Sequence, residues 1–154
     1  MPTHVIRSAR GLRYGFELER LDRLAAYLVP VGRAFFAAIF LMSAFGNFSQ
    51  RAIDQAARQG VPLATIAVPL AALISLAGGL SILLGYKARL GGWLIVLFLV
   101  PVTLMMHRFW AISDPMGARI QQVMFMKNLS MLGGALLIAH FGAGPVSLDA
   151  RRRR

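Results

Sequence analysis

The sequence predicts an all-α membrane protein, a four-transmembrane-helix bundle with both termini on the cytoplasmic side. Composition is the first reason, since 57% of the 154 residues are hydrophobic and only 15% are charged, whereas about a quarter of a soluble domain is charged. Length is the second reason, because a helix needs roughly 20 apolar residues to cross a hydrocarbon core of about 30 Å. Four stretches reach about this length: residues 27–48, 62–84, 90–106 and 123–141. The third reason is an excess of basic residues on one side of the predicted membrane.

The chain begins with a basic tail, residues 1–26, that contains an amphipathic segment. Leu18, Leu21, Leu24 and Leu28 recur at helical spacing, and arginines and a glutamate occupy the rest of the circumference. This pattern predicts an N-terminal amphipathic helix that lies at the inner membrane interface. The apolar run that follows is too long and starts too late for a secretory signal, so we interpret it as a retained helix.

Short connectors join the four stretches and leave no room for a folded soluble domain. We therefore expect residues 27–141 to form one transmembrane domain. The third stretch contains Pro101, and neighbouring helices re-satisfy the carbonyl that a proline frees, so we expect a kink there and not a break. Residues 142–154 form a second basic tail, which ends in four arginines.

The lysines and arginines of the short loops predict the orientation. With the N-terminus inside, eleven of the 17 basic residues lie on the inner side and five on the outer side, and Arg33 remains within the first stretch. The chain is therefore expected to be N-in and C-in. Its net charge of +11 is best explained by this topology and by anionic lipids of the inner leaflet, because each cation near that leaflet contributes about 1 kcal/mol. We expect these lipids as partners and no nucleic acid.

Polar residues gather at the predicted outer end of the bundle. Asn47 ends the first stretch, His107 and Arg108 follow the third, and Lys127 and Asn128 lie in the fourth. An ionisable group within a membrane is a candidate functional site by default. Two interpretations stay open: the five residues line a pocket for an anionic or carbonyl-bearing ligand, or Lys127 reaches lipid phosphates while Asn128 bonds a neighbouring helix.

Cations near the predicted inner end are candidates for contacts with lipid or another anion. Arg33 lies about one and a half turns into the first stretch, and snorkelling to the inner headgroups is the favoured interpretation. Lys87 and Arg89 lie in the connector between the second and third stretches. Because the apolar stretches contain no acid, we expect lipid phosphate or a ligand to neutralise Arg33 and Lys127.

The residue types argue against several redox and catalytic centres. The chain has no cysteine, which excludes disulfides, thiolate metal sites and covalent haem attachment. His107 and His140 lie at opposite ends of the bundle, so they cannot ligate one haem iron within a monomer. The apolar stretches also hold no acid for a Ser-His-Asp triad. We expect no intrinsic cofactor, no haem, no metal site and no catalytic residue, and hence a non-catalytic subunit.

Several motifs carry a resemblance to a known family. Along residues 28–149 the chain reads AFGNF, GVPLATIAVPLAALISLAGGLSILLGYKARLGG, MMHRFW, FMKNLSMLGGALL and GPVSLD in this order. Their order and spacing resemble the DoxX family of small four-helix bacterial membrane proteins. The positions that match residue types common in that family are Arg33, His107, Lys127 and Asn128. Two positions depart from it, because Asn47 and Ser75 stand where the family often has a lysine and a glutamate.

The resemblance implies a multi-pass protein of the bacterial inner membrane, associated with a quinone-linked oxidoreductase or redox system. The outer polar residues would then hold a quinone carbonyl or an anionic sulfur substrate, and electrons would come from a partner. Two alternatives stay open. One is a structural or assembly subunit of a larger membrane complex, with no activity of its own. The other is a small-solute carrier, which four helices without an inverted repeat or a broken helix support less well.

Overall fold

Helices joined by short turns and loops make up the part of the chain that its computed structural model describes, which is residues 3–152 for the backbone and residues 20, 21 and 24–152 for the side chains. Four helices are long and apolar enough to cross a membrane, which confirms the predicted fold class. These helices are α1 (Thr3–Gly46), α3 (Ala64–Leu84), α4 (Ala88–Met106) and α5 (Pro115–Phe141). The shorter elements are α2 (Gln50–Arg58), the 3-10 turn η1 (Phe109–Ala111) and α6 (Leu148–Arg151).

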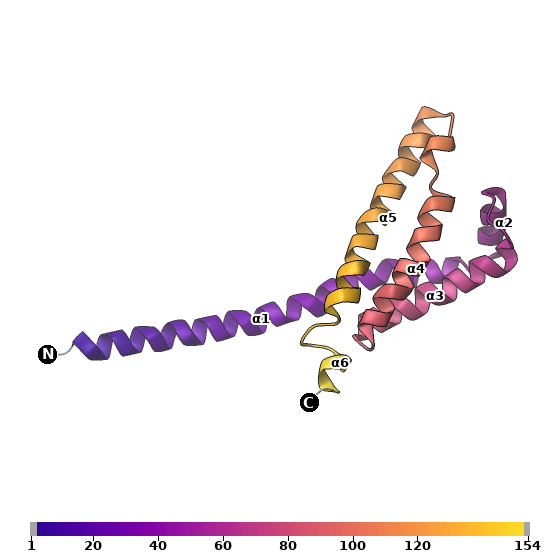
Figure 1. Ribbon diagram of the computed structural model, residues 1–154. Helices are drawn as coiled ribbons and strands as arrows, with labels where there is room; N and C mark the ends of the chain where they lie inside the picture. The colour runs from indigo at the N-terminus through magenta and orange to yellow at the C-terminus, as the bar shows by residue number, and fades with distance from the viewer. Residues whose placement is uncertain (1–2, 153–154) are drawn as a thin grey trace.

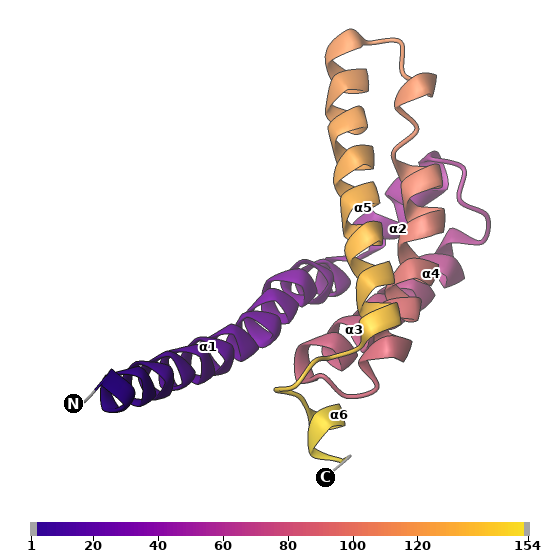
Figure 2. The same cartoon turned by 60° about the vertical axis from the view of Figure 1, so that its left-hand side comes forward.

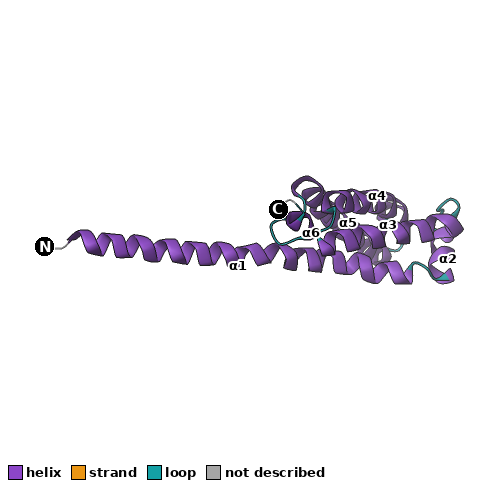
Figure 3. Cartoon of the chain, turned by 90° about the horizontal axis from the view of Figure 1, so that it is seen from below, coloured by secondary structure: helices purple, strands orange, loops and turns teal. Residues whose placement is uncertain are grey.

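Helix α1 is longer than any element that the sequence predicts. It runs without interruption from Thr3 through Pro30 to Gly46, and its membrane-spanning part is Leu24–Gly46. The predicted amphipathic helix is therefore the N-terminal part of α1 and not a separate element. Figure 3 shows this part of α1 extending well beyond the other helices.

Helix α5 begins earlier than its hydropathy indicates. Asp114 is its N-cap, and the carboxylate accepts a hydrogen bond from the Gly117 N–H at 2.6 Å. Pro115 occupies the first turn, where its fixed backbone angle and missing N–H are favourable. The helix thus starts before residue 123, because a cap and not the apolar stretch sets its first residue. Helix α4 continues through Pro101 to Met106, which confirms that the proline does not break it; the expected kink stays a prediction.

The first outer connector forms a helix that the hydropathy pattern does not reveal. Ser49 caps α2 by accepting a hydrogen bond from the Ala52 N–H at 3.3 Å. Ala56 is buried, whereas Arg51 and Asp54 are exposed. Helix α2 therefore covers the outer end of α3, which it contacts directly.

One hydrophobic core joins all four membrane-spanning helices. Phe40 from α1, Ile82 from α3, Leu99 from α4 and Ala135 from α5 are almost completely buried in it. Phe40 meets Phe98 edge to face, with ring centroids 6.2 Å apart. Helices α4 and α5 lie side by side, and α1 and α3 run across them (Figure 1). The core therefore sits where the two pairs of helices cross.

Glycines permit the closest approaches between these helices. A Cβ on Gly92 of α4 would lie 2.7 Å from the Ala139 nitrogen and 2.9 Å from the Ala135 carbonyl oxygen of α5. A Cβ on Gly78 of α3 would lie 3.1 Å from the Gly91 carbonyl oxygen of α4. Small residues allow helix backbones to come together in this way within membranes.

The outer surfaces of the spanning helices are strongly apolar. Exposed large side chains occur on every one of them, including Phe35, Leu70, Leu97 and Leu137, which expose 54–78% of their surfaces. An apolar surface of this extent is expected where lipid and not water surrounds the protein. The core and this surface together explain why most of the chain is hydrophobic.

Candidate functional site

An apolar cavity of about 400 Å³ lies at the predicted outer end, between α2, α3 and α4. We call it the outer cavity. Its walls are mostly aliphatic and include Ala67 and Ala71 from α3 and Val102 from α4. The small alanine side chains leave the space that a larger residue would fill. The polar residues of the described lining are Asn47, Gln55 and His107.

His107 is held in place at the rim of the outer cavity. It is the C-cap of α4, and its backbone N–H bonds the Thr103 carbonyl. Its Nδ1 lies 2.7 Å from Oε1 of Gln121 on α5. An amide oxygen only accepts hydrogen bonds, so Nδ1 is the donor in this contact, and Nε2 is the ring nitrogen left for another partner. The rim therefore offers a second ring nitrogen for a hydrogen bond with a ligand.

Arg108 is not part of the described lining of the outer cavity but follows His107, which lies at its rim. Its Nη2 donates to the Gln59 carbonyl at 2.5 Å, which ties the end of α4 to the loop after α2. Gly60 in this loop has a φ of +81°, a backbone conformation that glycine adopts without a steric penalty. Arg108 thus holds two of the elements that enclose the outer cavity.

The structure separates the remaining predicted outer residues from that cavity. Lys127 is exposed on α5, whereas Asn128 next to it is only 5% exposed. Consecutive helical residues point about 100° apart, so the two side chains face different surroundings. Of the five predicted residues, the outer cavity brings together Asn47 and His107. A lipid contact for Lys127 stays a prediction.

Arg33 is buried at the other end of the bundle and does not snorkel. Only 6% of its surface is exposed, and its guanidinium donates to the Ala143 carbonyl at 2.5 Å and the Val146 carbonyl at 2.8 Å. Both acceptors belong to the segment after α5. The prediction that Arg33 snorkels to the lipid headgroups is therefore wrong, because two of its guanidinium nitrogens donate hydrogen bonds to backbone carbonyls of the protein. The Nε atom is buried and has no hydrogen-bond partner among the described side chains and backbone.

Asp149 completes this connection from the C-terminal segment. Its backbone N–H bonds the Gly85 carbonyl at 2.8 Å. Its carboxylate accepts from the N–H groups of Lys87 at 2.7 Å and Ala88 at 3.0 Å, and so caps the start of α4. A Cβ on Gly85 would overlap the Arg33 guanidinium. We call these contacts of Arg33, Gly85 and Asp149 the inner clasp.

Most of the inner clasp comes from the motifs GYKAR and GPVSLD, whose contact the sequence does not predict. Asp149 is the sole acid after Asp114, and an isolated acid in a basic tail was the available signal. Figure 2 shows the C-terminal segment returning towards the turn between α3 and α4. Lys87 and Arg89, predicted as anion contacts, both lie at this turn or directly after it.

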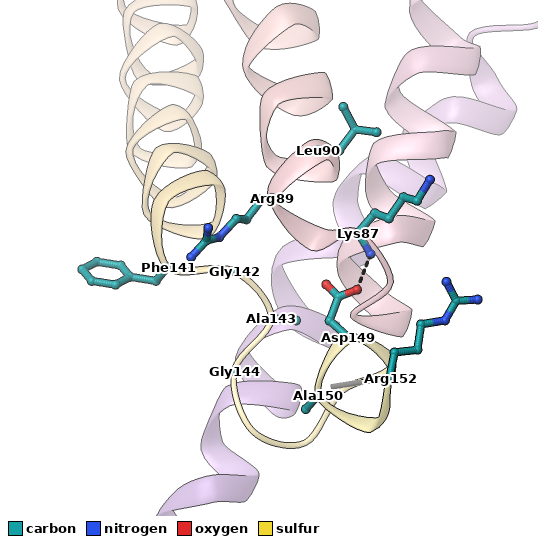
Figure 4. A pocket seen from close by; sticks show the side chains of 10 residues that line it. All are labelled: Lys87, Arg89, Leu90, Phe141, Gly142, Ala143, Gly144, Asp149, Ala150 and Arg152. Carbon is teal, nitrogen blue, oxygen red and sulfur yellow. Dashed lines mark hydrogen bonds between the residues drawn. The ribbon is translucent and has the colours of Figure 1, made fainter. Parts of the chain in front are cut away.

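A second, cationic pocket of about 570 Å³ lies beside the inner clasp (Figure 4). We call it the inner pocket. Lys87 and Arg89 line it together with Asp149 and Arg152. The Arg152 guanidinium stacks on the Tyr86 ring, 4.6 Å from its centroid, and donates to the Tyr86 hydroxyl at 3.3 Å. The inner pocket therefore contains three cations and one carboxylate.

The fold and these sites define a small polytopic membrane protein, with an apolar cavity at one end and a cationic pocket at the other. The chain belongs to the SURF4 family, whose family model matches residues 63–154. It is 29% identical to the inner membrane protein YqjF of Escherichia coli over 121 residues, which are 79% of this chain and 88% of that protein.

Two further relatives show how widely this similarity extends. The inner membrane protein YphA of Escherichia coli is 26% identical over 127 residues, or 80% of this chain and 89% of that protein. A Surfeit locus protein 4 homolog of Drosophila melanogaster is 31% identical over 74 residues, or 47% of this chain and 27% of that protein. No solved structure gives a significant match. The prediction of a multi-pass protein of the bacterial inner membrane is confirmed by the two E. coli relatives and the four spanning helices.

The resemblance to the DoxX family is wrong, because the matching family is SURF4. The quinone-linked oxidoreductase function that rested on it is wrong too, since neither the family nor its named relatives indicate a redox system. The quoted motifs have structural roles that explain the error. Glycine pairs such as Gly91 and Gly92 bring helices together, and GPVSLD forms part of the inner clasp. Such roles are useful in any small helical membrane protein and do not separate one family from another.

Proposed function

We propose that the chain is a membrane-embedded binding protein whose outer cavity takes a lipid-like ligand with an apolar body and a neutral hydrogen-bonding head. The observation that carries this proposal is the composition of the lining. It is apolar apart from Asn47, Gln55 and His107, and its described residues include no carboxylate, lysine or arginine. Because a charged head would lose its hydration there without a charged partner, a neutral head is favoured.

The size of the outer cavity supports a small ligand or one chain of a larger one. Its volume of about 400 Å³ falls within the range of about 300–1,000 Å³ that is usual for ligand pockets. Met105 and Met106 contribute to its wall, and flexible thioether side chains adapt to ligands of irregular shape. The site is therefore suited to a hydrocarbon chain more than to a rigid polar metabolite.

The polar residues support a hydroxyl or amide as the head of the ligand. His107 keeps Nε2 for a hydrogen bond with the ligand because Gln121 occupies Nδ1. The side-chain amides of Asn47 and Gln55 add donors and acceptors to the same lining. A few polar groups in an apolar pocket typically fix the orientation of a ligand. Binding, and not a chemical step, is the function that this lining supports best.

The proposal is tested by blocking the outer cavity. Ala71→Phe places a large side chain in the wall, and Ala77→Phe places the same side chain on the exposed face of the same helix. Native mass spectrometry of protein purified in mild detergent should show a bound amphiphile in the wild type and in Ala77→Phe. The amphiphile should be lost in Ala71→Phe.

A second variant keeps the test decisive if Ala71→Phe does not fold. Asn47→Leu removes a polar group from the end of α1 without adding bulk, and it should weaken retention of the same amphiphile. Thermal unfolding identifies variants that have lost their fold. Equal retention by the wild type, folded Ala71→Phe and Asn47→Leu would refute the proposed function.

A further inference from the structure

We infer that the inner pocket is a binding site for the phosphodiester headgroup of an anionic phospholipid of the inner leaflet. The pocket lies at the opposite end of the bundle from the outer cavity and shares no lining residue with it. The inference is therefore independent of the proposed function. It rests on charge, on depth in the membrane and on the apolar residues beside the cations.

The charge of the inner pocket is positive, because three basic residues and one carboxylate are part of its described lining. Asp149 is the carboxylate of its lining, and both carboxylate oxygens already accept backbone N–H groups at the start of α4. Among the residues whose side chains are described, neither Arg89 nor Arg152 has a carboxylate within hydrogen-bond distance. The Arg89 guanidinium thus remains available to phosphate oxygens, and Arg152, which donates from Nη1 to the Tyr86 hydroxyl, keeps its other N–H donors for them.

The cations flank the pocket on two sides. Figure 4 shows Arg89 on the side of Phe141 and Gly142, and Arg152 on the far side of Asp149. A Cβ on Gly142 would lie 3.4 Å from Arg89 Nε, so the arginine runs along the glycine backbone. This arrangement suits an extended headgroup, whose phosphate and polar substituent reach the two sides.

The depth of the pocket matches the level of lipid phosphates. Its lining includes Lys87, the N-cap of α4, and Phe141, the last residue of α5. These residues lie at the ends of two helices that are long and apolar enough to span the membrane, so we expect the hydrocarbon core to end near them. Cationic pockets between helices on the cytoplasmic side of membranes are typical binding sites for anionic lipid headgroups.

Apolar side chains in the same lining favour a lipid over a free phosphate ion. Phe141 is 72% exposed and Leu90 is 55% exposed, and both border the inner pocket. An acyl chain that follows a bound headgroup into the hydrocarbon core can cover them. A free phosphate ion would contact the cations and leave these two side chains uncovered. The lining therefore fits a molecule that has a phosphate and a chain.

The test measures lipid binding to the full-length protein by native mass spectrometry, with phosphatidylglycerol or phosphatidylcholine added to the detergent. The wild type should bind phosphatidylglycerol in preference to phosphatidylcholine. The double variant Arg89→Gln, Arg152→Gln should lose about 25-fold in affinity, since each cation near an anionic lipid contributes about fivefold. The matched control Arg58→Gln, Arg119→Gln removes two exposed cations at the outer end and should bind as the wild type does.

Three results would overturn the inference. One is equal binding of the two lipids by the wild type, and another is an equal loss in the pocket and control variants. The third is complete displacement of phosphatidylglycerol by millimolar glycerol phosphate, which would assign the site to a free phosphate compound. Asn47→Leu, which tests the outer cavity, should leave phosphatidylglycerol binding unchanged, so the two proposals fail separately.

Discussion

At the scale of single residues, the protein holds a buried arginine by hydrogen bonds to backbone carbonyls. Arg33 donates to two carbonyls from the segment after α5, 110 and 113 positions away in the sequence. A planar guanidinium reaches both acceptors at once, whereas the point charge of a lysine does not have this geometry. Arg33 thus joins α1 to the C-terminal segment, and its charge has a structural role.

Replacing Arg33 should therefore destabilise the protein. Arg33→Met removes the donors to the carbonyls of buried Ala143 and partly exposed Val146 and should cost about 2–3 kcal/mol, the usual contribution of hydrogen bonds to a charged group. Arg33→Lys should restore only part of this loss. Thermal unfolding in detergent measures the effect, and Arg20→Met, which removes an exposed cation from the same helix, serves as the control. An Arg33→Met protein as stable as the control would contradict the role given to the inner clasp.

The sequence predicts at which level of the membrane each candidate residue lies, but it does not predict which side of its helix the residue faces. Counting residues along each stretch places Asn47, His107 and Lys127 at one end of the bundle, and Asn47 and His107 do share a cavity there. Depth follows from the rise of a helix, but the side that a residue faces depends on how the helix is rotated against its neighbours. For this reason Lys127, which is exposed, was predicted to lie with the residues of the outer cavity.

At the scale of elements, hydropathy located the four spans because the membrane requires apolar helices of a minimum length. It did not locate α2 or the start of α5, which depend on the capping side chains of Ser49 and Asp114. Hydropathy also does not predict the inner clasp, since Arg33 and Asp149 meet the turn at Gly85 only after the chain has folded. Local patterns therefore predict the spans and leave the long-range contacts between them undetermined.

The contact between α4 and α5 yields a sharp test of helix packing. Gly92→Ala would place a methyl group against the backbone of Ala139, so the helices must move apart, at a cost of about 1–3 kcal/mol. Gly133→Ala adds the same methyl group to α5 where no described atom lies within 4 Å apart from the adjacent residues and backbone of its own helix. It should be neutral or stabilising by up to about 1 kcal/mol, because alanine favours helices.

Unfolding temperatures of the two glycine variants in one detergent decide this prediction. Gly92→Ala should have a lower unfolding temperature than Gly133→Ala. If both variants unfold at the wild-type temperature, the close packing of α4 on α5 does not limit stability.

At the scale of the whole molecule, the two ends of the bundle differ in chemistry. The outer end has an apolar cavity with a neutral rim, and the inner end has the inner clasp and a cationic pocket. The excess of basic residues at the inner end agrees with the positive-inside rule. The two proposals together assign a lipid contact to each end, through an apolar chain in the outer cavity and a phosphate in the inner pocket.

The orientation can be tested directly because the chain has no cysteine. Single cysteines at two exposed positions, Arg58→Cys and Arg151→Cys, report on opposite ends of the bundle. A membrane-impermeant maleimide should label Arg58→Cys in intact spheroplasts, and it should label Arg151→Cys only after lysis. The reverse pattern would show that the protein has the opposite topology and that the inner pocket faces the periplasm.

The central claim is that the outer cavity holds a lipid-like ligand, and photo-crosslinking from inside the cavity tests it most directly. A photoreactive amino acid at Val102 lies in the cavity lining, and the same amino acid at Leu97 lies on the exposed surface of the same helix. After illumination in native membranes, mass spectrometry should find one discrete amphiphile on the Val102 protein and a mixture of bulk lipids on the Leu97 protein. The same bulk mixture at both positions, or crosslinks from Val102 to protein alone, would contradict the account.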